Sequence, residues 1–199
     1  MGRPTLHDRD ALLDAAIRLF ARDGARGLTV AAVAREAGAP SGSVYHRFPD
    51  RPTLLASVWL RTVRRFHEAY VEAAAVSPSP SAAVAAVAWT VEWCRAHLEE
   101  ALVLQAGVTA FAPGEWRADS VRDWNQLRDR QSEAIDIVVR SVAAQSGRST
   151  AEVGFAMFDL PLAVVRRHLL TGSPPPAEST GLARGLAAAI LLAGSTREA

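Results

Sequence analysis

Residues 29–51, TVAAVAREAGAPSGSVYHRFPDR, restrict the possible folds of this chain more than any other stretch. The Thr29 hydroxyl can accept a hydrogen bond from the unpaired amides of a first helical turn. Apolar residues then recur at helical spacing, namely Val30, Val33, Ala34 and Ala37. Gly38 suits the left-handed residue that ends a helix, and Val44 and Phe48 lie one turn apart on a second short helix. Two short helices joined by a tight turn constitute a helix-turn-helix.

The rest of the chain has helical periodicity interrupted by loop signals. Loops are expected at Ser77–Ser81 and Gly172–Pro176, and a kink at Pro161, which leaves the carbonyl of Met157 without its partner. The further expected helices cover residues 8–23, 51–76, 82–97, 98–110, 121–147, 150–171 and 180–194. We therefore predict an all-α fold of about nine helices, with an N-terminal three-helix head (residues 1–50) and a C-terminal helical body (residues 51–199). The helix from residue 51 to about 76 links the two.

Composition narrows the class of protein. Nearly half of the 199 residues are apolar, which is enough for a substantial core. Residues 1–67 contain 11 arginines and 6 acidic residues, whereas the remainder contains 11 arginines and 15 acidic residues. The basic N-terminal third suits a polyanion. A single cysteine, Cys94, and the lack of a long apolar run favour a soluble cytoplasmic protein without a membrane partner.

The helix-turn-helix and its flanks resemble the tetracycline-repressor (TetR) family of bacterial transcription regulators. The resemblance covers roughly residues 9–56 and rests on LLDAAIRLFARDG, on the turn around Gly38 and on GSVYHRFPDRPTLL. It implies a homodimer with N-terminal DNA-reading heads and a body that holds an effector pocket, most often in a repressor released from a palindromic operator by its ligand. Pro40 stands where a capping serine is usual, and Ser41 where a basic or polar residue often lies. Because of these departures, the operator sequence that the chain reads cannot be taken from the family, whereas the expected DNA-binding role is unaffected.

The outward residues of the second short helix suit double-stranded DNA. Gly42 permits close approach of the backbone, and Ser43 and Tyr45 can contact base edges or phosphates. Thr29 and Arg51 lie at helix N-termini, where an anion is favoured. The predicted DNA contacts are Arg3, Thr29, Ser41, Gly42, Ser43, Tyr45, His46, Arg47 and Arg51. The alternatives are a disordered tail for Arg3, a half-buried packing role for Tyr45, and a solvated surface position for His46.

The body is rich in aromatic side chains, as ligand cavities often are. We predict an effector pocket, for a hydrophobic or aromatic small molecule, lined by Trp89, Trp93, Phe111, Trp116, Trp124 and Phe158. Polar groups could come from Glu92, Gln105, Asn125 and Gln131, and ordinary core packing is the alternative for each aromatic residue. The last two helices are rich in Ala and Gly, so they are predicted to form the homodimer interface as a four-helix bundle. Packing within one chain is the alternative there.

No pattern in the sequence is typical of catalysis. Cys94 and His97 lie three residues apart on one helix, but two ligands alone make a poor metal site. No nucleophile elbow, phosphate-binding loop or dinucleotide fingerprint occurs. The sequence therefore predicts no cofactor, no metal and no enzymatic activity. The alternative to a DNA-binding regulator is a helical small-molecule-binding or scaffold protein without DNA binding, and the basic N-terminal third argues against it.

Overall fold

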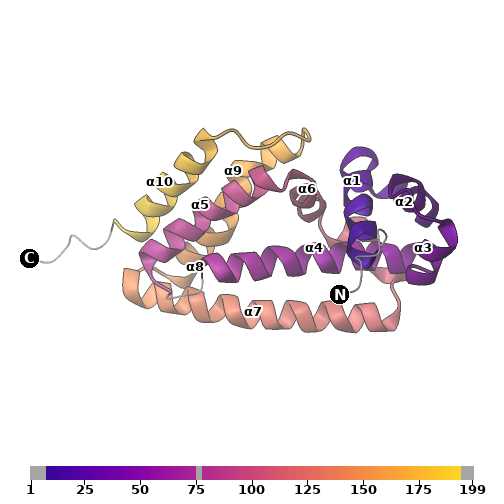
Figure 1. Cartoon of the computed structure of the whole chain (residues 1–199). Coiled ribbons are helices and arrows are strands. Elements are labelled where there is room, and N and C mark those ends of the chain that lie inside the picture. Colours follow the sequence, from indigo (N-terminus) through magenta and orange to yellow (C-terminus); the bar gives the residue numbers. More distant parts are fainter. Residues whose placement is uncertain (1–7, 75–77, 194–199) are drawn as a thin grey trace, which may run out of the picture. The chain divides into compact units, whose positions relative to one another are not determined.

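The computed structural model describes residues 8–74 and 78–193, and within these ranges the chain is helical with no strand (Figure 1). The predicted DNA contact Arg3 lies outside them. The α-helices are α1 (Arg9–Gly27), α2 (Val30–Glu36), α3 (Ser41–Arg47), α4 (Arg51–Ala74), α5 (Pro80–Ala96), α6 (Leu98–Ala106), α7 (Ala118–Ser146), α8 (Thr150–Gly154), α9 (Leu160–Leu169) and α10 (Glu178–Leu191). The predicted all-α class is confirmed.

The chain divides into two compact units. Unit 1 comprises residues 1–64 and 99–126, and unit 2 comprises residues 65–98 and 127–199. Both α4 and α7 contribute residues to each unit. This division follows packing, whereas the boundary predicted at residue 50 follows the DNA-binding head, so that boundary stays a prediction.

Side-chain caps begin several of the helices. The Asp8 carboxylate accepts from the amide of Ala11 at 2.8 Å, and the Thr29 hydroxyl accepts from the amide of Ala32 at 3.1 Å. Asp50 and Ser79 cap α4 and α5 in the same way. At α8, Ser149 and Glu152 form a reciprocal capping box. Each cap satisfies an amide that the helix itself leaves unpaired, which stabilises a helix by about 1 kcal/mol.

The core of unit 1 combines aliphatic and aromatic side chains. Phe20 of α1 stacks on Phe111 with ring centroids 4.9 Å apart, and Trp59 of α4 lies 5.5 Å from Phe111 and 5.6 Å from Trp124. The indole nitrogen of Trp116 donates to the carbonyl of Phe111 at 2.7 Å. The 3₁₀ turn Val108–Phe111 lies at the end of the helix predicted over residues 98–110, and Pro113–Glu115 lies between that helix and the one predicted from residue 121. These turns thus bring Phe111 and Trp116 to a buried core.

In unit 2, α5 packs against both α9 and α10, and α9 also packs against α10 (Figure 1). The α10 residues Ala183, Ala187 and Leu191 recur every four positions and are buried. Small side chains at this spacing let two helix backbones approach closely. The alanines of α10 therefore serve packing within the chain, which is the alternative weighed for this helix.

A π-helical turn, Phe155–Asp159, joins α8 to α9 into one continuous helical segment. The amide of Leu160 donates to the carbonyl of Phe155, five residues earlier. Pro161 has no amide hydrogen to offer the carbonyl of Met157, so a regular α-helical pattern is impossible here. The predicted disturbance at Pro161 takes the form of this wider turn, a feature often found at functional sites.

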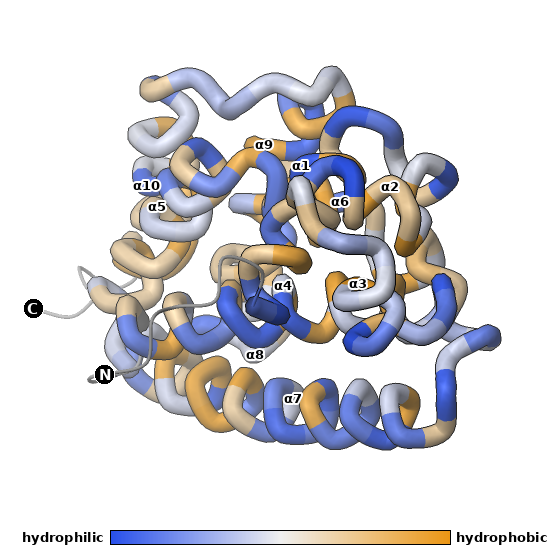
Figure 2. Tube along the Cα trace, turned by 45° about the vertical axis from the view of Figure 1, so that its right-hand side comes forward, coloured by the Kyte–Doolittle hydropathy of each residue, from blue (hydrophilic) through white to orange (hydrophobic). Residues whose placement is uncertain are grey.

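Along α7, hydrophilic and hydrophobic residues alternate at helical spacing (Figure 2). Val139 and Val142 are buried, whereas charged residues such as Asp129 and Arg130 are exposed. Among the described residues, no helix is both long enough and apolar enough to cross a bilayer.

Candidate nucleic-acid interface and ligand cavity

The turn between α2 and α3 has the geometry of a helix-ending Schellman motif. Gly38 adopts a φ of 62°, in the left-handed region that favours glycine. The amide of Ala39 donates to the carbonyl of Ala34 at 2.9 Å, and the amide of Gly38 donates to that of Arg35 at 3.2 Å. Both bonds are those of the motif. The turn predicted at Gly38 is therefore present, and it fixes how α3 leaves α2.

The α3 helix has one buried side and one exposed side. Val44 and Phe48 are completely buried, as their one-turn spacing predicted. Tyr45 is 48% exposed, and Ser41, Gly42 and His46 are also exposed. Pro40 occupies the N-cap position, and no side chain caps α3, which agrees with the missing capping serine noted in the sequence. The structure thus brings the predicted contacts of this helix together on a solvent-facing surface.

Ser43 and Arg47 are half-buried and hydrogen-bonded to each other. The Arg47 Nη1 atom donates to the Ser43 hydroxyl at 2.8 Å and to the Ser43 carbonyl at 3.0 Å. A long arginine side chain held in this way loses little further entropy when it binds a partner. The pair keeps the guanidinium positioned on the surface of α3.

Arg51 has a role that the sequence interpretation missed. Its Nε donates to the carbonyl of Leu28 at 3.1 Å, and its Nη2 donates to the carbonyl of Ala25 at 2.7 Å. Arg51 therefore ties the start of α4 to the segment between α1 and α2. Because the Nε and Nη2 atoms, which form one edge of the guanidinium, are already engaged, we assign Arg51 to holding unit 1 together and leave it out of the proposed phosphate contacts. The side-chain pattern of the sequence carried no signal for bonds to backbone carbonyls.

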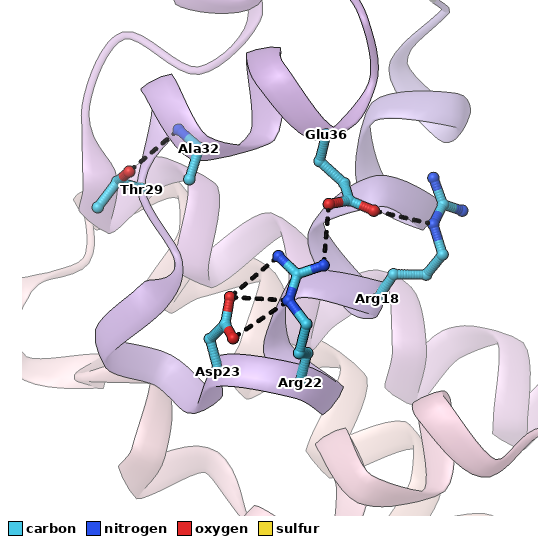
Figure 3. A network of polar contacts seen from close by, with 6 residues as sticks. All are labelled: Arg18, Arg22, Asp23, Thr29, Ala32 and Glu36. Atoms are coloured by element: carbon cyan, nitrogen blue, oxygen red, sulfur yellow. Dashed lines mark hydrogen bonds and ion pairs between the residues drawn. The ribbon is translucent and has the colours of Figure 1, made fainter.

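Much of the positive charge of the N-terminal third is paired inside unit 1. Figure 3 shows Arg18 and Arg22 of α1 on the carboxylate of Glu36, at 3.6 and 3.2 Å, with Arg22 also bonded to Asp23. Arg61 pairs with Asp10 and Asp14, and Arg64 with Asp123. These ion pairs join helices, so the arginines in them are not a surplus of charge for a polyanion.

Two exposed arginines outside the predicted DNA contacts have no carboxylate partner among the described residues. Arg26 and Arg35 are exposed and make no ion pair with another described residue. Their outward positions beside the buried Leu28 and Ala34 were the signal available in the sequence. Together with Arg47, they provide unneutralised positive charge on unit 1.

Nothing in the described part of the chain explains why residue 42 is a glycine. A Cβ atom built on Gly42 would meet no other atom within 4 Å, and its φ is not in the left-handed region. Glycine inside a helix costs about 1 kcal/mol relative to alanine. The folded chain itself gains no space or turn from this glycine, and the backbone of α3 is left uncovered at this position.

Unit 2 contains a cavity of about 180 Å³ between helices α4, α5, α7 and α9 and the π-helical turn. Most of its lining is apolar, and the polar exceptions are His67, Tyr70, Thr90 and Gln131. Burial lowers the pKa of His67 and raises the pKa of Tyr70 to about 12, so both side chains are uncharged at neutral pH. The apolar members of the lining are Phe66, Val71, Ala134, Ile135, Val138, Met157, Phe158, Pro161 and Leu162.

The aromatic residues predicted to line the pocket do different things. Phe158 lines this cavity, as predicted. Trp89 and Trp93 do not: they pack on the rings of Phe66 and Tyr70, with Trp93 4.8 Å from Phe66, and so support the wall. Phe111, Trp116 and Trp124 belong to unit 1, where they form its core. These five residues do not line this cavity, and their place in an effector pocket stays a prediction.

Of the four polar residues suggested for the pocket, only Gln131 lines the cavity. Its Nε2 atom is buried without a hydrogen-bond partner, and so is the hydroxyl of Tyr70. Buried polar groups are almost always hydrogen-bonded, and each exception calls for an explanation. Both atoms are covered by surrounding protein atoms, so neither is presented to the cavity.

A second hollow lies between α9 and α10. It is lined mainly by exposed or half-buried apolar side chains, which are Phe155, Leu160, Ala163, Val164, Leu182, Leu186, Ala189 and Ile190, together with Arg167. Leu182 and Leu186 are 51% and 45% exposed. They recur with Ile190 every four residues, next to the buried alanine side of α10, so an apolar stripe faces solvent.

Cys94 is buried, and burial raises the pKa of its thiol to about 12. A protonated thiol is neither a nucleophile nor a metal ligand. His97 lies close to it in sequence, but its Nδ1 is 3.1 Å from the carbonyl of Trp93 and its ring stacks on the Trp93 indole. Among the described residues, no three His, Cys, Asp or Glu side chains gather into a candidate metal site.

The comparison with known proteins fits the geometry of α2, its turn and α3. Residues 12–58 match the model of the bacterial regulatory proteins of the tetR family. Residues 12–58 thus match the N-terminal region of the TetR family of bacterial regulators, and α3 is the second helix of the helix-turn-helix within this region.

The relatives differ in how much of the chain they cover. The HTH-type transcriptional repressor ComR of Escherichia coli K12 is 37% identical over 71 residues, so the match spans about a third, 34%, of either chain. The fatty acid degradation regulator FadR from Bacillus halodurans covers 96% of this chain with a TM-score of 0.69 and 17% identity, over 100% of its own chain. The regulator FadR from Bacillus subtilis, solved with stearoyl-CoA, covers 92% with a TM-score of 0.70 and 13% identity, over 98% of its own chain. At these identities the comparison shows that the two structures share the fold of this chain.

Proposed function

We propose that this protein is a ligand-responsive transcriptional repressor that binds a palindromic operator as a homodimer. The observation that carries the proposal is the α3 surface, where Gly42 and Tyr45 face solvent on a helix whose opposite side is fully buried. A recognition helix of this kind lies in the major groove and contacts base edges with its exposed side chains. The relative ComR of Escherichia coli is a transcriptional repressor.

The proposed DNA contacts follow from exposure and bonding. Gly42 lets the backbone of α3 approach the groove, and Tyr45 and Ser41 meet base edges or thymine methyl groups. His46 and the pre-positioned Arg47 meet phosphates, and Ser43 orients Arg47. The Thr29 oxygen accepts from the Ala32 amide, so the hydroxyl hydrogen is available to donate to a phosphate.

Dimerisation is proposed to occur through α9 and α10. The apolar stripe of α10 and the hollow beside it would be covered by the same surface of a second copy, as two-fold symmetry requires. Contiguous exposed apolar surface of this kind commonly marks a protein interface. Two copies of α9 and α10 would form the four-helix arrangement expected from the sequence.

Ligand control is proposed to act through α4. Leu54 and Leu55, near the start of α4, are buried in the core of unit 1, whereas His67 and Tyr70 of the same helix line the cavity of unit 2. A ligand that shifts α4 would change the separation of the two DNA-binding domains in a dimer. The two half-sites are separated by one helical turn of DNA, about 34–36 Å, or by a multiple of it. Two DNA-binding domains held at another separation cannot both bind.

Selection of genomic DNA fragments by the purified full-length protein tests the proposal. We expect enriched fragments that share a palindrome, with half-sites about one helical turn or a multiple of it apart. Failure to enrich any sequence, with no binding to random duplex at low salt, would contradict the proposal. That result would favour a helical scaffold or small-molecule-binding protein without DNA binding.

A further inference from the structure

Arg9, in the first turn of α1, is held in a fixed orientation beside the C-terminal end of α3. Its Nη2 atom donates to the Ser57 hydroxyl of α4 at 2.9 Å, and its Cζ atom lies over the Phe48 ring, 5.6 Å from the ring centroid. Phe48 is the residue that directly follows α3. The Ser57 hydroxyl donates to the carbonyl of Thr53 at 2.8 Å, so its oxygen is left to accept from Arg9. The start of α1 is thereby fixed at the junction of α3 and α4 (Figure 1).

The positive charge of Arg9 is not neutralised by a carboxylate of the described chain. The side chain is exposed, and it makes no ion pair with another described residue. The acidic residues on either side of it in sequence are engaged elsewhere, since Asp8 caps α1 and Asp10 pairs with Arg61 at 3.8 Å. A guanidinium has five N–H donors, and Arg9 donates one hydrogen bond to the described residues. Most of its donors are therefore available to an anion.

The place of Arg9 matches that of a phosphate at the edge of the major groove. A seven-residue helix such as α3 is about 10 Å long, and the groove is about 12 Å wide. A cation at the end of α3 therefore lies near one sugar–phosphate backbone when α3 lies in the groove. A guanidinium whose side chain is already ordered loses little further entropy when it binds that phosphate.

We propose that Arg9 is a phosphate-binding residue that holds the DNA backbone at the C-terminal end of α3, with Ser57 and Phe48 as the residues that position it. The assignment rests on the proposed function, because it takes α3 as the helix that enters the groove. It extends the DNA-binding surface to the start of α1, before the matched residues 12–58. The contacts that join α1 to α4 thus also keep the guanidinium oriented for DNA.

Salt dependence separates a phosphate contact from a purely structural role. In fluorescence anisotropy with the full-length protein, Arg9→Gln should weaken binding to a selected duplex and to a random duplex by a similar factor, roughly tenfold. The slope of log affinity against log salt concentration should become shallower by about 0.9 for each bound subunit, because one phosphate contact is lost. Arg9→Lys retains the charge and should restore the wild-type slope.

Ser57→Ala tests the positioning of the guanidinium. This variant removes the acceptor for Arg9 and keeps the positive charge, so it should weaken binding about threefold while the salt slope stays at the wild-type value. Alanine favours the helix at this position, so the variant should fold. Arg140→Ala is the matched control, because Arg140 is an exposed arginine of α7 that makes no ion pair with another described residue. It should change neither the affinity nor the slope.

A folded Arg9→Gln variant with the wild-type salt slope would overturn the assignment, even if its affinity falls. A role limited to holding α1 on α4 leaves the number of phosphate contacts unchanged. Circular dichroism shows whether Arg9→Gln is folded, and Ser57→Ala provides a second test, since wild-type affinity in that variant would contradict the proposal.

Failure of the proposed function would look different. A wild-type protein that binds neither the selected nor the random duplex would contradict DNA binding itself. Wild-type binding that Arg9→Gln leaves unaltered at every salt concentration would contradict only the role of Arg9.

Discussion

Arg51 shows how one side chain can serve folding where its position in the sequence favours DNA binding. It follows Asp50, the residue that caps α4, and such a position is well placed for a phosphate. In the structure, however, its guanidinium bonds the carbonyls of Ala25 and Leu28. The residue stabilises the connection that sets α2 against α1.

The Arg51→Ala variant should therefore destabilise the protein. Two hydrogen bonds from a charged donor are lost, and a reduction of about 2 kcal/mol in the free energy of unfolding is expected. For a chain of this length, that corresponds to a fall of roughly 4–8 °C in the melting temperature, measured by circular dichroism. Arg35→Ala, an exposed arginine without an ion-pair partner, should leave the melting temperature unchanged. Weakened DNA binding by Arg51→Ala at an unchanged melting temperature would return Arg51 to the DNA-contacting set.

For single residues, the sequence predicted whether a side chain is buried or exposed wherever the periodicity of its own helix decides this. Val44 and Phe48 are buried and Tyr45 is exposed, as the spacing of α3 indicated, so the packing alternative for Tyr45 is not supported. The partners of Arg18, Arg22 and Arg61 depend on which helices meet, and no local pattern contains that information. The charge excess of the N-terminal third therefore overstated the charge available to DNA.

At the scale of secondary-structure elements, the start of a helix can be predicted from a single capping residue, because the cap bonds an amide of the first helical turn. Thr29 caps α2, as the sequence predicted, and Asp50 and Ser149 cap α4 and α8 through contacts that are equally local. The π-helical turn before Pro161 was expected only as a kink, since a proline removes a donor without specifying how the chain compensates. The 3₁₀ turn Val108–Phe111 was predicted as the end of the helix over residues 98–110, and Pro113–Glu115 was not predicted as a helix, because such short turns carry too little periodicity to detect.

The exposed apolar side of α10 leads to a prediction about dimerisation. Leu186 lies on the exposed apolar stripe, so Leu186→Glu should leave the chain folded and place an unpaired charge in the proposed interface. In sedimentation velocity, the wild-type protein should have twice the chain mass of 21.3 kDa, and Leu186→Glu should sediment as a monomer.

Leu170→Glu provides the control for this experiment. Leu170 is also an exposed leucine, but it lies just beyond the end of α9 and does not line the hollow between α9 and α10. Its variant should remain dimeric. A wild-type monomer at micromolar concentration, or a dimer that survives Leu186→Glu, would contradict the proposed interface.

For the whole molecule, the fold class and the approximate number of helices were predictable because each long helix carries its own apolar side. The distribution of aromatic residues was not predictable in this way. Phe111, Trp116 and Trp124 belong to the core of unit 1, while Phe66, His67 and Tyr70 of α4 line the cavity. Which buried side chains surround an empty space depends on how helices distant in sequence pack, and the hydrophobic pattern alone does not encode it.

The central claim is that the exposed side of α3 reads DNA. The most direct measurement is fluorescence anisotropy of a selected duplex titrated with the wild-type protein, with Tyr45→Ala and with Gly42→Ala, over a series of salt concentrations. Both residues are exposed, and a methyl group at residue 42 meets no atom of the chain, so both variants should fold, with Gly42→Ala at least as stable as the wild type.

We expect wild-type binding to weaken steeply with salt. Each variant should lose roughly tenfold or more in affinity, because a base contact or the close approach of the backbone is removed. Wild-type affinity in both folded variants would contradict the claim that this surface of α3 contacts DNA.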